Sequence, residues 1–173
     1  IPELEPAFYD LSESDMDIQF SAANTYFGKS ENMTLREIMQ ALRETYCGTV
    51  GAEYMHCTDP AEKRWWQERL ERVRSKPSFS ADEKKHILDR LTAAEGLERY
   101  LHTKYVGQKR FSLEGGESFI ASMDELVQRA GEKGVQEIVI GMAHRGRLNV
   151  LVNTLGKMPK DLFAEFDHTA KED

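Results

Sequence analysis

The chain has 173 residues, of which 40% are hydrophobic and 31% are charged, with a formal net charge of -7 and a sequence pI of about 5.3. This balance is that of a folded globular protein rather than a disordered one. The negative charge argues against nucleic acid as a partner, and no apolar run approaches the length of a membrane span.

The first 33 residues carry few regular signals and are expected to form an irregular N-terminal segment, residues 1–33. Pro2 and Pro6 limit helix formation there. The chain starts at Ile1 rather than at an initiator methionine, and it ends in the polar stretch Asp167 to Asp173. We interpret both ends as cut or processed, so that the sequence is an internal piece of a longer chain.

Three helix starts are predicted in a helical region that we assign to residues 34–106. Two are capping boxes, in which a serine or threonine precedes a glutamate by three residues. The third is an aspartate followed by a proline at the first helical position. These signals are Thr34 with Glu37, Ser80 with Glu83, and Asp59 with Pro60. Apolar residues recur at helical spacing after each start, which predicts a mostly helical region.

The pattern changes near Gly107 to that of an α/β fold. A helix is predicted over 119–127, and the apolar run from Glu137 to Met142 predicts a short buried strand. Helices are predicted again over 148–155 and from Pro159. Residues 107–173 therefore have the pattern of a helix–strand–helix piece of a larger sheet.

A single strand cannot satisfy its own backbone hydrogen-bonding groups. Either residues 54–57 and 110–113 add strands, or the sheet is completed outside this chain. The second alternative agrees with a chain that is cut at both ends.

The stretch most suggestive of chemistry is His144-Arg145-Gly146-Arg147, between the predicted strand and the next helix. In open α/β sheets, ligands bind beyond the carboxyl ends of strands, and helix N-termini favour anions. Arginine binds carboxylate or phosphate groups, and histidine exchanges a proton near neutral pH. The pattern predicts a corner that binds a carboxylate and donates a proton. In the structural alternative, His144 caps the helix and the arginines pair with acids elsewhere.

Four sequence blocks occur together in an order typical of one enzyme family. The blocks are Gly51-Ala52-Glu53-Tyr54-Met55-His56, Thr92-Ala93-Ala94-Glu95-Gly96-Leu97-Glu98-Arg99-Tyr100-Leu101, Lys109-Arg110-Phe111-Ser112-Leu113-Glu114-Gly115-Gly116-Glu117, and Gly141-Met142-Ala143-His144-Arg145-Gly146-Arg147-Leu148-Asn149-Val150-Leu151. From about residue 34 to 166 the chain resembles the first component of 2-oxoglutarate dehydrogenase. Pyruvate-specific and transketolase-type relatives share the fold but not this set of blocks.

The resemblance implies decarboxylation of 2-oxoglutarate in the tricarboxylic acid cycle, with thiamine diphosphate and magnesium as cofactors. It implies succinyl transfer to the lipoyl arm of dihydrolipoyl succinyltransferase, in a complex that also contains dihydrolipoyl dehydrogenase. The parent enzyme is expected to be a homodimer. Residues 107–173 would be the incomplete start of its diphosphate-binding parallel-sheet domain.

The resemblance also implies roles for three residues. His144 would be catalytic, because it matches a histidine that contacts substrate or adduct and assists proton transfer. Arg145 would bind the distal carboxylate of the substrate, directly or through neighbours. Phe111 would line the substrate pocket and exclude water. No cofactor-binding or metal-binding residue is assigned within the chain.

Part of the family pattern is missing from this sequence. We find neither the Gly-Asp-Gly and Asn signature that binds magnesium and diphosphate nor the glutamate that activates the cofactor. The chain alone is therefore expected to keep one wall of the site. It is expected neither to bind the cofactor tightly nor to turn over.

Two other functions stay open. One is a non-enzymatic helical interaction module that binds a partner through the helix carrying Trp65 and Trp66, with His144 purely structural. The other is the same chemistry on a related 2-oxo acid such as 2-oxoadipate.

The predicted location is the cytoplasm, because the blocks look closer to bacterial members of the family. The mitochondrial matrix is expected instead if the source is eukaryotic. The two cysteines, Cys47 and Cys57, are too few for a disulfide framework and suit a reducing compartment.

Overall fold

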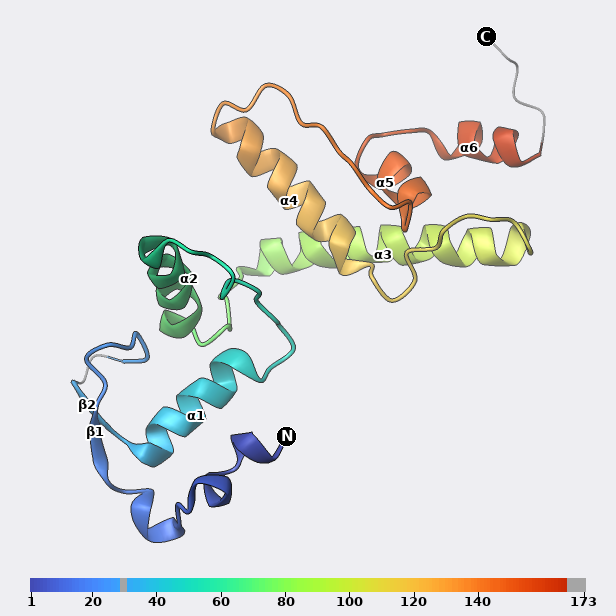
Figure 1. Cartoon of the computed structure of the whole chain (residues 1–173). Coiled ribbons are helices and arrows are strands. Elements are labelled where there is room, and N and C mark those ends of the chain that lie inside the picture. The colour runs from blue at the N-terminus through green and yellow to red at the C-terminus, as the bar shows by residue number, and fades with distance from the viewer. Residues whose placement is uncertain (29–30, 168–173) are drawn as a thin grey trace. The chain divides into compact units, whose positions relative to one another are not determined.

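A computed structural model describes residues 1–28 and 31–167 of the chain. It contains two compact units, Ile1–Ser78 and Phe79–Asp173, and each is described by itself (Figure 1). The predicted division at 107 concerns a diphosphate-binding domain of a longer protein, and it stays a prediction. The expectation of a mostly helical N-terminal part is confirmed.

The N-terminal unit begins with short elements that the sequence does not signal. Three 3-10 helices, Pro2–Leu4, Pro6–Tyr9 and Glu13–Asp15, precede strands β1 (Gln19–Ser21) and β2 (Asn32–Thr34). The two strands pair antiparallel, with Phe20 opposite Met33. Met33 is buried in a small cluster that reaches helix α1, so the strand pair is attached to the helices by apolar packing. The buried members of this cluster are Ala22, Phe27, Met33 and Ala41.

The helices of the first unit start where local signals predict them. Helix α1 spans Leu35–Tyr46, and Thr34 and Glu37 form the predicted capping box. Helix α2 spans Pro60–Arg72, and the Asp59 side chain accepts a hydrogen bond from the backbone N–H of Ala61. Both predictions are confirmed because caps depend only on neighbouring residues.

The second unit is built around one long helix, α3, which spans Ala81–Lys104 and starts with the predicted Ser80 and Glu83 capping box. Helices α4 (Ser118–Glu132) and α5 (Arg147–Asn153) pack against α3 and against each other (Figure 1). Helix α6 (Pro159–Phe166) starts at the predicted proline.

One face of α3 holds this unit together. Its buried residues recur at helical spacing: Ala94, Leu97, Glu98 and Leu101. Ala94 belongs to a cluster with Leu113, Ile120 and Val150, whereas Leu97 and Leu101 pack with Leu148 and Leu162. Glu98 is therefore a charged residue on a face that is otherwise apolar.

The strand predicted from Glu137 to Met142 is wrong for this chain. Residues 135–143 are irregular, and Val139 is 96% exposed. A strand requires backbone partners on a neighbouring strand. The described residues offer none, because residues 54–57 and 110–113, the strands of the first alternative, are irregular as well. The truncated helix–strand–helix unit is thus present only as its helices.

Among the helices of residues 1–28 and 31–167, none combines the length and the hydropathy that crossing a bilayer requires.

Candidate functional site

Phe111 and His144 lie side by side although they are far apart in the sequence. Their ring centroids are 5.6 Å apart, and the ring planes are inclined by 41°. Phe111 lies in the irregular connection between α3 and α4, and His144 lies just before α5. Two of the three predicted site residues are therefore neighbours, and both side chains are substantially exposed.

The two connections are joined by specific contacts. The backbone N–H of Gly146 donates a 2.7 Å hydrogen bond to the carbonyl oxygen of Phe111. The Nη2 of Arg145 donates a 2.8 Å hydrogen bond to the carbonyl oxygen of Glu114. These contacts give Arg145, the third predicted site residue, a place in the same assembly.

Both ring-bearing residues have left-handed backbone conformations that are uncommon outside glycine. The φ angle is 48° at Phe111 and 71° at His144. Such conformations cost about 1–3 kcal/mol each and persist only where surrounding structure holds them. The arrangement of the two rings is therefore set by its surroundings rather than by local preference.

The structural alternative for this stretch does not agree with the geometry. The N-cap of α5 is Gly146, and no side chain caps this helix. Within the described part of the chain, neither Arg145 nor Arg147 forms an ion pair with a carboxylate. The guanidinium carbon of Arg147 lies 5.9 Å from the centroid of the Phe111 ring, within cation–π range. Because α5 has only seven residues, we assign no anion-binding role to its N-terminus.

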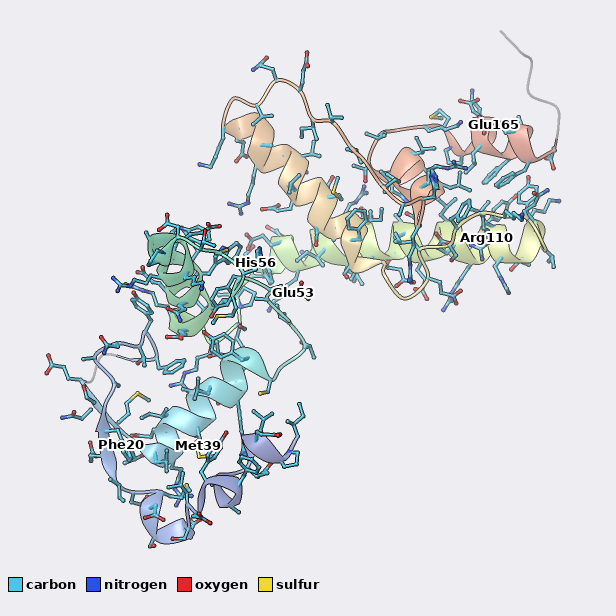
Figure 2. All side chains as sticks on the ribbon, viewed as in Figure 1. Phe20, Met39, Glu53, His56, Arg110 and Glu165 are labelled. Carbon is cyan, nitrogen blue, oxygen red and sulfur yellow. The ribbon has the colours of Figure 1, made fainter. Side chains whose placement is uncertain are left out.

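A buried carboxylate lies beneath this assembly. The Glu98 side chain is 7% exposed, and both of its oxygens accept hydrogen bonds. Oε1 accepts from the backbone N–H of Leu113 at 3.0 Å and from Asn149 Nδ2 at 3.1 Å. Oε2 accepts from Ser112 Oγ at 2.7 Å and from Arg110 Nη1, which also forms an ion pair with it. Figure 2 shows Arg110 beside α3.

The donors outweigh the cost of burying the Glu98 charge. Burial raises the pKa of its carboxyl, but the hydrogen bonds from Leu113, Ser112 and Asn149 and the positive charge of Arg110 lower it further, so the net pKa lies below the ordinary value. Glu98 is thus held in the charged form by the segment that flanks Phe111 and by α5.

Sequence reasoning missed Glu98 and its partner Asn149. A signal existed, because Glu98 lies at helical spacing with the apolar residues Ala94 and Leu101. Asn149 likewise stands between Leu148 and Val150 and is fully buried. A polar residue on an apolar face has to find a buried partner, which is the clue that connects the two.

The side chains described do not by themselves fit the magnesium ion that the family resemblance implies. Residues 1–28 and 31–167 contain no group of three histidine, cysteine, aspartate or glutamate side chains placed to share a metal. A hollow of about 470 Å³ between α3 and α4 is lined by residues such as His86 and Leu91, and neither Phe111 nor His144 lines it.

The two tryptophans of α2 are both substantially exposed, at 47% for Trp65 and 37% for Trp66. Their rings meet edge to face with centroids 4.9 Å apart, and the guanidinium of Arg69 lies 4.0 Å from the Trp65 centroid. No partner chain is present, so the interaction-module alternative stays a prediction.

Comparison with known proteins gives three close sequence matches. The 2-oxoglutarate dehydrogenase E1 component of Cupriavidus necator is 77% identical over 167 residues, which cover 96% of this chain and 18% of the relative. The proteins of the same name from Azotobacter vinelandii and Haemophilus influenzae are 56% and 47% identical, over 95% and 96% of this chain and over 17% and 18% of those relatives. No protein-family model matches the chain.

The similarity runs along almost the whole chain and includes all four sequence blocks, so the chain is homologous to a segment of an oxidoreductase. It belongs to the 2-oxoglutarate dehydrogenase E1 component family. The chain spans less than a fifth of the length of the curated relatives described above.

Proposed function

We propose that the chain forms one wall of the active site in an enzyme that oxidatively decarboxylates 2-oxoglutarate. The observation that carries this proposal is the pairing of Phe111 with His144 at 5.6 Å, inside two of the four family blocks. The names of the close relatives support the substrate. In the whole protein, thiamine diphosphate bound with magnesium would supply the nucleophile for decarboxylation, and the succinyl group would pass to a lipoyl arm.

The residues of the wall have distinct proposed roles. His144 is exposed, so its imidazole is available to donate a hydrogen bond or proton to the reacting oxygen of a 2-oxo acid. Phe111 presents an aromatic surface that excludes water beside it. Arg145 uses one N–H on Glu114 and has further donors for the distal carboxylate of the substrate.

The proposed setting is a homodimeric E1 component in a cytoplasmic multienzyme complex with dihydrolipoyl succinyltransferase and dihydrolipoyl dehydrogenase. The bacterial relatives and the relatives' name support this setting. The described residues do not fit the metal, so this chain is proposed to act on the organic substrate and to leave cofactor binding to other parts of the protein.

The test uses the full-length protein with thiamine diphosphate, magnesium and ferricyanide as electron acceptor. Wild type, His144→Ala and the control His86→Ala are compared on 2-oxoglutarate, 2-oxoadipate and pyruvate. We expect wild type and the control to prefer 2-oxoglutarate, and His144→Ala to lose at least about 100-fold in kcat/KM. Activity that survives in His144→Ala would make that histidine structural. No turnover of any 2-oxo acid would favour the interaction-module alternative.

A further inference from the structure

Glu98 connects the two segments that carry the proposed site. Three of its four donors, on Arg110, Ser112 and Leu113, come from the residues immediately around Phe111. The fourth donor is Asn149 on α5, the helix that follows His144 directly. One carboxylate on α3 therefore fixes both segments to the same buried position.

The connection matters because neither ring-bearing residue holds its backbone conformation by itself. Phe111 and His144 both have left-handed φ angles, and such strain requires outside support. At Phe111 the support reaches the residue before it and the two after it. At His144 it arrives through α5, where the Asn149 side chain also donates to the carbonyl of Ala94 at 3.0 Å.

The burial of Glu98 makes this support rigid. Asn149 is fully buried, and the Arg110 side chain is only 11% exposed. A buried carboxylate that lost these donors would leave several polar groups without partners. The loop around Phe111 and the start of α5 therefore cannot shift independently without breaking buried hydrogen bonds.

We infer that Glu98 is a positioning residue of the active-site wall, which sets the placement of Phe111 and His144 through their neighbours. This inference rests on the proposed function. Catalytic groups lose roughly 100-fold in rate when they are misplaced by about 1 Å, so loss of the Glu98 clamp is expected to be visible in turnover.

The experiment uses the full-length enzyme in a double-mutant cycle with Glu98→Gln, Phe111→Ala and the combined variant. Glu95→Gln is the matched control, because Glu95 lies on the same helix and pairs with the exposed Arg99. All variants are assayed for 2-oxoglutarate oxidation well below their unfolding temperatures, with the folded fraction measured by circular dichroism. Glu98→Gln is expected to lower kcat/KM by roughly 10- to 100-fold, and Glu95→Gln to leave it unchanged.

The cycle separates positioning from general damage. If Glu98 acts through Phe111, the combined variant should be no worse than about twofold below the poorer single variant. Losses that multiply would overturn the inference, as would full activity in Glu98→Gln. If Glu98→Gln does not fold, Glu98→Asp replaces it in the same cycle, because it keeps the charge and shortens its reach. If the wild-type enzyme does not oxidise 2-oxoglutarate, the proposed function itself fails, which is a separate result from an active wild type with an unaffected Glu98 variant.

Discussion

A β-carbon placed on Gly146 would lie 2.6 Å from the Cδ1 of Leu113, a buried side chain in the core of the second unit. Gly146 also has a φ of 73°, which favours glycine. This close approach lets the segment before α5 reach the loop that carries Phe111. The absence of a side chain at 146 is thus part of how the candidate site is assembled.

We expect Gly146→Ala to lower the free energy of unfolding of the 173-residue chain by about 2 kcal/mol, through backbone strain and the clash with Leu113. The matched control is Gly96→Ala, in the exposed middle of α3, where a β-carbon meets nothing within 4 Å. That change is expected to raise the free energy by about 0.5–1 kcal/mol. Urea unfolding followed by circular dichroism measures both, and equal effects of the two substitutions would contradict the packing argument.

The Glu98 clamp predicts a defined dependence of stability on pH. The folded-state pKa of Glu98 is depressed, so its contribution is fully present above the unfolded-state pKa. The contribution is lost as the pH falls through the lower folded-state pKa. Near neutral pH, Glu98→Gln is expected to cost about 3 kcal/mol, because it removes the charge that compensates the buried Arg110.

The measurement is urea unfolding of wild type and Glu98→Gln at a series of pH values from neutral downward. The difference between them should stay constant down to the ordinary glutamate pKa and then shrink. Glu95→Gln, at an exposed position on the same helix, should differ little from wild type at every pH. A difference between wild type and Glu98→Gln that does not change with pH would show that the carboxylate charge is not what the clamp uses.

The starts of the helices were predictable because each one depends on residues within a single turn. Thr34 with Glu37, Ser80 with Glu83, and Asp59 with Pro60 all form the predicted caps. Pro159 likewise starts the last helix. These signals need no knowledge of the tertiary structure.

The features that failed or were missed depend on contacts between distant parts of the chain. Apolar composition from Glu137 to Met142 indicates burial, but a strand also needs a partner, which the described residues do not supply. The proximity of Phe111 and His144 depends on the close approach at Gly146. The role of Glu98 could have been suspected from its place on an apolar helix face, but its partners could not.

Cofactor binding provides a direct test of how much of the site this chain carries. We expect the 173-residue chain to show no saturable binding of thiamine diphosphate with magnesium at micromolar concentrations. The reason is that its described residues gather no set of metal ligands, and its sequence lacks the diphosphate signature. Isothermal titration calorimetry measures this, with the full-length protein as the positive control. Micromolar binding to the short chain would show that it carries a cofactor site of its own.

The exposed apolar segment between α4 and α5 predicts self-association of the 173-residue chain. Val135, Ile138, Val139 and Met142 are all at least 37% exposed, and the backbone beside them has no strand partner among the described residues. Unpaired apolar backbone of this kind promotes pairing between chains. Val139→Lys is therefore expected to increase the monomer fraction in size-exclusion chromatography with light scattering, without changing the unfolding temperature. Val106→Lys is the matched control, because Val106 is 83% exposed but lies outside this segment. If both substitutions change association equally, added charge rather than the segment explains the effect.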